Sequence, residues 1–551
     1  MIGAPLLATL ALALAPGGPA DGAPPFWGGL EPGPYAVGFR SWWVTDPGRR
    51  YTWRPEDRAL LGGGEPPTGP RPVLVNAWYP APPEHDGPAL LHGGYLDIAP
   101  AGDELGALGA LPAALAAYAR DVVALEVTDQ DAHDLTPEAA AALEAAFATP
   151  TAARRDAPAA DGPFPVVLYH SGYGSSFEDN AVLCELLASH GYVVLGSAFL
   201  RRGGESFNVD GRDDSLADLE HLLRQAADAP ARGLPAVDLT RVGMAGHSGG
   251  AHVSLEFAAR PRSPVDAVVA LDTTQDHHSV HDRRWWRLID ATVGDTEHLV
   301  EPVLLATGPT AAFQLADTWS GAERFYLTFP TLDHNDYIHQ GILRAETLAG
   351  LPGGEVTAAQ AAALRTEYEA LCRRVVRFLD AHLEDDADAA HALRTGDRDG
   401  ALGAGVHLEL APRGVTGAAP YDRASAAPPT PRELRRLLRD EGPEAALAVL
   451  REHHEAHPDA PVYQLLNALA YVFELVAEGD TAAAQQAADF YRPLHPDLGF
   501  FYRWFAGNTR SPESGAYREH ALAAALLWDP EDAEALRLRD ELRAEAAAAG
   551  R

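Results

Sequence analysis

From residue 164 onward the chain alternates short apolar runs with stretches of helical periodicity, and this alternation restricts the folds it can adopt. Strands separated by helices pair in parallel, in a sheet that helices cover on both faces. Ligands of such sheets bind at the carboxyl ends of the strands. The sequence therefore predicts an α/β fold. The apolar runs are 166–169, 192–197, 242–245, 267–271, 303–306 and 325–329, and the helical stretches are 179–190, 214–229, 251–260 and 358–382.

Two further features precede this series. Residues 35–44 and 72–80 are rich in aromatic and β-branched residues and are bounded by Pro and Gly, so they are predicted as a pair of early strands. Between about 89 and 161 an Ala-rich insertion carries helical stretches at 108–120 and 136–148. Insertions of this kind often cover a functional site.

The segment Gly246-His247-Ser248-Gly249-Gly250 fits the pattern G-x-S-x-G, at the point where an apolar run gives way to a helical stretch. Neighbours without a Cβ permit the sharp turn that exposes a serine there, and the N-terminus of the next helix favours developing negative charge. Ser248 is therefore the candidate nucleophile. The alternative is an ordinary glycine-rich turn.

A nucleophilic serine needs a base and an acid that orients it, and in such sheets they follow in the order Ser, Asp or Glu, His. Asp272 directly follows the run 267–271, and His334 lies in the loop after 325–329. We predict both as partners of Ser248, with His339 as the reserve base. Asp272 could instead be a turn residue at the end of a strand.

The glycine-rich loop 170–176 follows the run 166–169. A backbone N–H from such a loop and the N–H after the nucleophile form the oxyanion hole of enzymes with this arrangement. The predicted donors are the backbone amides of Tyr173 and Gly249.

Four side chains are candidates for the wall of a substrate pocket, although aromatic residues of this kind are more often part of the core. Residues 276–282 hold His and Asp at spacings that can ligate zinc, but a polar cover beside Asp272 is the simpler interpretation. We predict no metal and no cofactor. The pocket candidates are His247, Trp285, Trp286 and Trp319.

Length and charge limit the function classes. A chain of 551 residues that is 46% hydrophobic can form two or three domains. Its net charge of −35, with no lysine, would repel phosphate backbones and anionic headgroups. We therefore expect no nucleic-acid partner and a neutral or weakly charged substrate.

Residues 1–25 resemble a secretory signal peptide in their apolar core and small residues, but they lack the positively charged start. The prediction is a secreted or periplasmic protein, or a cytoplasmic one if this segment is a disordered leader. No other stretch is long and apolar enough to span a bilayer. Cys184 and Cys372 are expected as buried free thiols, with a disulfide between them left open.

The character of the chain changes after the segment 26–384, which we predict as the catalytic domain. Residues 385–431 are predicted as a linker and residues 432–551 as a helical domain. Within the latter, Pro458, Pro496 and Pro530 are spaced 38 and 34 residues apart. This is close to the tetratricopeptide period and predicts a repeat domain that binds a partner or docks on the first domain. A plain helical bundle is the alternative.

The stretch from Gly33 to about His382 resembles the α/β-hydrolase superfamily, and within it the branch of platelet-activating-factor acetylhydrolases and dienelactone-hydrolase-like esterases. That branch takes its acid from the strand right after the nucleophile, which matches Asp272. Ser171, where members commonly have His, and the long insertion depart from the pattern. The resemblance is carried by Gly33-Pro34-Tyr35-Ala36-Val37-Gly38, Trp78-Tyr79-Pro80, Ser171-Gly172-Tyr173-Gly174, residues 187–194, the segment 246–250 and Ala270-Leu271-Asp272.

The resemblance implies a carboxylic ester hydrolase with a Ser248-His334-Asp272 triad and an acyl-enzyme intermediate, acting on a small-molecule or lipid-like ester. Two alternatives stay open. A serine peptidase or thioesterase would use the same triad. A hydrolase-fold scaffold without activity would act through its C-terminal helices, although a scaffold has no physical reason to keep all three triad residues.

Overall fold

The structure is a computed structural model. It describes residues 24–55, 61, 64–201, 203–204, 212–260, 262–272, 299–308, 316, 319, 321–354, 356–395, 406–411, 437–456, 465–493, 498–508 and 515–549. The predicted signal peptide lies almost wholly outside these residues and stays a prediction. Within the described part, no helix is long and apolar enough to cross a membrane. Cys184 and Cys372 are buried free thiols.

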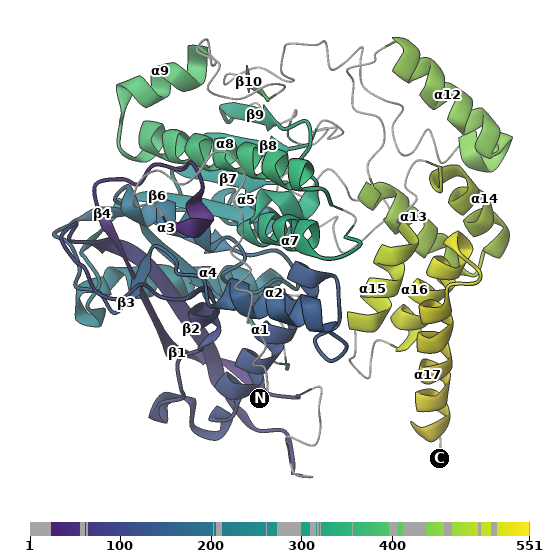
Figure 1. The fold of residues 1–551 in the computed structure, drawn as a ribbon, viewed down its shortest axis with the longest axis horizontal. Helices are drawn as coiled ribbons and strands as arrows, with labels where there is room; N and C mark the ends of the chain where they lie inside the picture. The colour runs from purple at the N-terminus through teal and green to yellow at the C-terminus, as the bar shows by residue number, and fades with distance from the viewer. Residues whose placement is uncertain are drawn as a thin grey trace, which may run out of the picture.

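The core of the chain is a 10-stranded sheet in the order β10-β9-β8-β7-β6-β4-β5-β2-β1-β3 (Figure 1). From β5 to β9 all neighbouring strands are parallel, whereas β2 is antiparallel to both β5 and β1. The prediction of an α/β fold is therefore confirmed. The strands are β1 Ala36–Thr52, β2 Thr68–Ala81, β3 Ala153–Arg155, β4 Phe164–His170, β5 Val193–Ser197, β6 Val237–His247, β7 Ala267–Leu271, β8 Val303–Thr307, β9 Arg324–Thr328 and β10 His407–Ala411.

Successive side chains of the central strands point to opposite faces, and helices cover both faces. Val167, Ala245 and Val269 face a cluster with α3 (Ala181–Ser189) and α8 (Ala358–Leu383). Their neighbours Val166, Met244 and Val268 face a second cluster with α4 (Arg212–Ala227) and α5 (Gly249–Ala258). Each fully buried Val, Leu, Ile or Met side chain stabilises the fold by about 1.5–3 kcal/mol. The two apolar faces explain why these strands appear in the sequence as continuous apolar runs.

The predicted insertion folds into the 3-10 helices His92–Leu96 and Asp103–Leu108, then α1 (Leu111–Thr128) and α2 (Pro137–Phe147). Helix α1 packs against α7 (His339–Gly350), which follows the loop of His334. An ion pair of 2.6 Å between Arg344 and Asp129 joins the two helices. The insertion is thus attached to the chain segment that carries the predicted base.

Part of the predicted linker belongs to the sheet. Residues 387–395 form α9 (Ala387–Thr395), and β10 pairs antiparallel with β9, His407 opposite Thr328. The apolar alternation at 406–410 therefore indicates a strand, because its buried side needs the sheet as a partner. Residues 396–405 and 412–431 lie outside the described residues.

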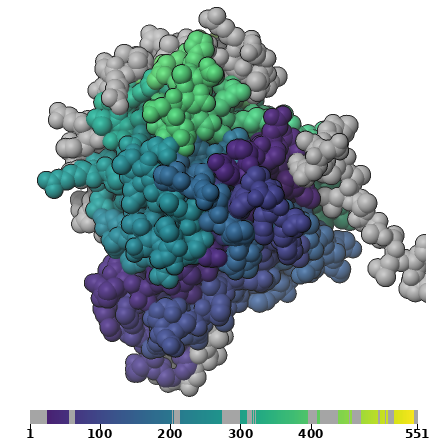
Figure 2. Space-filling model, turned by 90° about the vertical axis from the view of Figure 1, so that its left-hand side faces the viewer, coloured from purple at the N-terminus to yellow at the C-terminus, as the bar shows by residue number. Residues whose placement is uncertain are grey.

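The C-terminal helices form a separate apolar cluster, centred on side chains such as Tyr491, Leu522 and Trp528. They lie together on one side of the sheet in Figure 1, and none of them is visible from the opposite side (Figure 2). Pro458 and Pro496 lie outside the described residues, so the tetratricopeptide-like repeat stays a prediction. The helices are α12 Pro443–Ala456, α13 Leu465–Glu478, α14 Thr481–Tyr491, α15 Leu498–Asn508, α16 Gly515–Trp528 and α17 Ala533–Ala549.

Candidate active site

Ser248 lies on a strained turn between β6 and α5, with φ 52° and ψ −122°. For a residue other than glycine, a backbone held at such a φ costs about 1–3 kcal/mol of strain. The turn also requires glycine on both sides. A Cβ on Gly246 would lie 2.5 Å from the backbone of Gly250, and one on Gly250 would lie 2.2 Å from the carbonyl oxygen of His170. The G-x-S-x-G pattern is therefore explained by close backbone contacts.

The structure brings Ser248, His334 and Asp272 together. The Oγ–H of Ser248 donates to Nε2 of His334 over 2.9 Å, and Nδ1–H of His334 donates to Oδ2 of Asp272. The second oxygen of Asp272 accepts from the hydroxyl of Thr307 at 2.6 Å. Asp272 is 6% exposed and also has a positive φ of 41°. One hydrogen-bonded chain thus runs from the hydroxyl to a buried carboxylate.

The strand ends fix these residues relative to one another. The N–H of Ser248 donates to the carbonyl of Leu271 at 3.0 Å, and the N–H of Asp272 donates to that of Ala306 at 2.7 Å. The turns after β6 and β7 are therefore bonded to the neighbouring strand ends. The sequence gives no signal for the role of Thr307, at the end of β8, because a Thr in a strand is common.

The short 3-10 helix that carries His334 (His334–Tyr337) is held by a capping box. The carboxylate of Asp333 accepts from the N–H of His334 at 2.8 Å, and that of Asp336 accepts from the N–H of Asp333 at 2.9 Å. From the other side, Nε2–H of His247 donates to the carbonyl of His334 at 2.8 Å. The predicted pocket residue His247 is 2% exposed. In the structure it supports the His334 segment.

Burial and charge set the protonation of the two histidines. Burial alone would lower the pKa of His334, but the hydrogen bond and the charge of Asp272 outweigh it and raise that pKa above the ordinary value. Burial, together with the charge of His334, lowers the pKa of His247 to about 3. At neutral pH, His247 is therefore uncharged. The charged imidazolium form of His334, in contrast, is stabilised by Asp272.

The predicted oxyanion residues are also neighbours. The ring of Tyr173 lies so close to Gly249 that a Cβ on Gly249 would be 2.6 Å from it. Gly249 is the first residue of α5, where backbone N–H groups have no partner in the helix itself. The loop after β4 and the start of α5 therefore meet beside Ser248.

Other predicted residues lie elsewhere. Trp319 is fully buried in the cluster against α4 and α5, as expected of a core residue. The reserve base His339 is buried with its ring 4.7 Å from that of Phe26, and it is His334 that bonds to Ser248. Trp285, Trp286 and the cluster 276–282 lie outside the described residues. Among the residues that are described, no three His, Cys, Asp or Glu converge in a way that could hold a metal.

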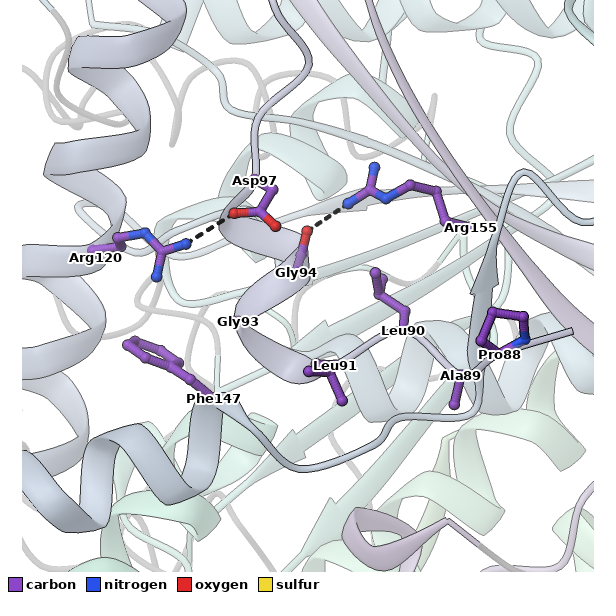
Figure 3. Close-up of a pocket in the computed structure, with 10 residues that line it drawn as sticks. All are labelled: Pro88, Ala89, Leu90, Leu91, Gly93, Gly94, Asp97, Arg120, Phe147 and Arg155. Carbon is purple, nitrogen blue, oxygen red and sulfur yellow. Dashed lines mark hydrogen bonds and ion pairs between the residues drawn. The ribbon is translucent and has the colours of Figure 1, made fainter.

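A surface hollow of about 380 Å³ lies on the insertion (Figure 3). Leu91 and Phe147 form apolar parts of its wall. Arg120 pairs with Asp97 at 2.9 Å, and Arg155 donates to the carbonyl of Gly94. None of Ser248, His334 and Asp272 lines it. The hollow is therefore separate from the hydrogen-bonded chain of the candidate site.

The strand order, the antiparallel β2 and the order Ser, Asp, His along the strand ends define the α/β-hydrolase fold. No protein-family model and no curated protein matches the sequence. Among solved structures, a ferulic acid esterase from Streptomyces cinnamoneus is similar at 21% identity and a TM-score of 0.35, over 64% of this chain and 91% of that chain. The fold is assigned from the sheet topology and not from this likeness.

Proposed function

We propose that the protein is a serine hydrolase that cleaves carboxylic esters through an acyl-enzyme intermediate. The observation that carries the proposal is the 2.9 Å contact between Ser248 Oγ and His334 Nε2, with His334 oriented by Asp272. A hydroxyl becomes nucleophilic when a base within hydrogen-bond distance can take its proton. The strained backbone at Ser248 supports the same role, because strain of this kind is concentrated at functional sites.

The geometry supports the following sequence of steps. His334 takes the proton of Ser248 as Oγ bonds to the ester carbonyl carbon, and the N–H groups of Tyr173 and Gly249 stabilise the oxyanion. His334 then gives the proton to the alcohol oxygen as that C–O bond breaks, which leaves an acyl-serine. A water molecule then bonds to the acyl carbon while His334 takes its proton. His334 returns that proton to Oγ of Ser248 as the C–Oγ bond breaks, which releases the carboxylic acid. Asp272 holds the imidazole and stabilises its charged form.

The substrate class rests on charge and on the position of the acid. With a net charge of −35 the protein attracts anionic substrates poorly, which favours neutral or weakly charged esters. Asp272 follows β7, the strand after the nucleophile's helix, as in the acetylhydrolase and dienelactone-hydrolase branch. A peptidase or thioesterase would need the same triad, so the leaving group must be determined by assay.

The test is hydrolysis of p-nitrophenyl esters from acetate to palmitate by the wild type and by Ser248→Ala. We expect turnover with the wild type and a loss on the order of 10⁶-fold in the variant. Ser254→Ala is a matched control, since this serine of α5 donates to the carbonyl of Gly250 at 2.8 Å and has no bond to His334. No turnover on any ester, or turnover that survives Ser248→Ala, would refute the proposal and favour the scaffold.

A further inference from the structure

The loop that carries Tyr173 is anchored by a buried carboxylate just before α3. Oδ2 of Asp179 accepts from the N–H of Gly172 at 3.3 Å, and Oδ1 accepts from the hydroxyl of Tyr169 at 2.6 Å. Asp179 has no exposed surface. Both of its oxygens accept hydrogen bonds, which is the pattern of an ionised carboxylate.

The residue that Asp179 binds, Gly172, is the most flexible type of residue in its backbone. Gly172 has no side chain to fix it, and a Cβ there would lie 3.0 Å from Nδ1 of His247. Glycine loses more conformational freedom on folding than other residues, so an external contact has to restrict it. The peptide that follows Gly172 carries the N–H of Tyr173. The carbonyl of that peptide accepts from the N–H of Ser175 at 3.3 Å, and the bond on the Gly172 N–H fixes the peptide before it. Together the two bonds limit the direction of the predicted oxyanion donor.

The same segment bonds to the chain that follows His334. The carbonyl of Asp179 accepts from the N–H of Gln340 at 3.0 Å. The side-chain oxygen of Asn180 accepts from the N–H of His339 at 3.2 Å and from the hydroxyl of Tyr368 at 2.6 Å. Residues 179 and 180 thus bond both to the loop 170–176, which carries Tyr173, and to the start of α7, and so fix the two segments relative to each other.

Keeping a carboxylate at this place is costly. Burial raises the pKa of Asp179 to about 7, against the opposing effect of its hydrogen bonds from Tyr169 and Gly172. Two more acidic side chains lie close, Glu178 with a pKa raised by burial to about 7 and Glu126 with one raised to about 8. Replacement of buried charged groups by well-packed apolar residues is often neutral or stabilising, so packing alone gives no reason for a carboxylate here.

We propose that Asp179 is a positioning residue for the oxyanion hole, acting through Gly172 on the backbone N–H of Tyr173. The inference rests on the proposed ester hydrolysis. Asp179 does not touch the reacting atoms; it fixes the direction of a donor that bonds to the oxyanion. Its loss should therefore weaken stabilisation of the transition state more than binding of the ester.

The variant that tests this is Asp179→Asn, which keeps the shape but supplies one acceptor oxygen for two donors. Loss of an oxyanion donor costs on the order of 10²–10³-fold in kcat. For a misdirected donor we expect kcat to fall at least tenfold while KM stays within threefold. The assay uses the best p-nitrophenyl ester at pH 8.5, where Asp179 is ionised in the wild type.

The matched control is Glu178→Gln. Glu178 is equally buried and adjacent, but it accepts from the side chains of Ser176 and Gln340 and has no bond to Gly172. We expect its kcat to stay within threefold of the wild type. An equal loss of kcat in both variants, or an unchanged kcat in Asp179→Asn, would overturn the inference.

A second readout separates this inference from the proposed function. A fluorophosphonate phosphonylates an activated serine and releases fluoride, whatever ester the protein prefers. We expect wild type and Glu178→Gln to be labelled at Ser248 at similar rates, and Asp179→Asn at least tenfold slower. No labelling of the wild type would refute the proposed function and this inference with it. Normal labelling of all three would refute only the inference.

Hydrogen exchange of the wild type gives a measurement that needs no variant, in case Asp179→Asn does not fold. The Gly172 N–H should exchange at least 100-fold more slowly than an unprotected amide. Exchange at the unprotected rate would show that Asp179 does not hold it.

Discussion

The carboxyl edge of the sheet and the C-terminal helices differ in what they bury. At the edge, Ser248 and Asp272 have positive φ values, and the carboxylates of Asp179 and Glu178 have no exposed surface. In the described part of α12–α17, Arg518 is the one buried polar or charged side chain, and only glycines have a positive φ. Strained non-glycine residues and buried carboxylates thus occur together at the carboxyl edge, whereas the described part of the helices has neither.

This difference separates features that lower the stability of the fold from features that raise it. Strain and buried carboxylates reduce stability, so the edge needs the two apolar faces of the sheet to offset them. The helices bury mainly Ala, Leu and aromatic side chains, which stabilise their own cluster. The comparison predicts that substitutions of Ser248, Asp272 and Asp179 at the edge affect turnover and that substitutions among the helices affect folding.

Apart from Ser248→Ala, the largest expected effect is that of Asp272→Asn on turnover. Without the carboxylate, the imidazole of His334 loses its orientation and the stabilisation of its charged form, so kcat should fall on the order of 10³–10⁴-fold. The raised pKa of His334 should also fall. Since the base acts in its neutral form, the acid limb of the pH–kcat profile should move to lower pH. Steady-state kinetics from pH 5 to 9 measure both effects.

Asp266→Asn is the matched control for Asp272→Asn. Asp266 precedes β7 at its other end and accepts from the N–H of Val242 at 2.8 Å. Its kcat should stay within threefold of the wild type. If both variants lost turnover alike, the carboxyl edge would not be special and the comparison would fail.

The next effect concerns stability. Leu522 is fully buried in the helical cluster, and Leu522→Ala should lower the free energy of unfolding by about 2–5 kcal/mol. Turnover of the folded protein should not change. Urea unfolding followed by tryptophan fluorescence, with kcat measured in parallel, checks both. A large loss of kcat without unfolding would mean that the helices contribute to the site.

The smallest effect is a change in how stability depends on pH. Burial raises the pKa of Glu126 to about 8, so the folded protein keeps a proton that the unfolded chain loses above about pH 4.5. The folded state then loses stability as the pH rises through this window. Glu126→Gln should reduce that decline by on the order of 1 kcal/mol.

Unfolding free energies at pH 5.5, 7 and 8.5 measure this difference. Glu138→Gln, at an exposed position of α2, should leave the pH dependence as in the wild type. An unchanged slope in Glu126→Gln would show that Glu126 does not hold this proton in the folded state.

The sequence predicts those features that depend on neighbours along the chain. The strands from β4 to β9 appear as apolar runs because both of their faces are buried. Ser248, Asp272 and His334 could be selected because each follows such a run, and the structure brings the three together. Their catalytic role stays a prediction until turnover is measured.

Contacts between distant segments could not be predicted. Ser175 donates to Glu126 at 3.0 Å across 49 residues, and this contact depends on where α1 packs. Pairing of β10 with β9 likewise depends on the path of the chain after α8. The sequence likewise cannot show that the ring of His247, a predicted pocket residue, reaches the carbonyl of His334.

The pairing of β10 has a consequence for self-association. A long exposed edge strand offers unpaired N–H and C=O groups on which another copy can add a strand. At the β9 side, the described part of the sheet ends in a short strand, β10 with 5 residues. By pairing with β9, β10 covers the backbone groups of that strand. This side of the sheet is thereby a poorer template for edge-to-edge aggregation, and deletion of residues 406–411 should make the protein more prone to it.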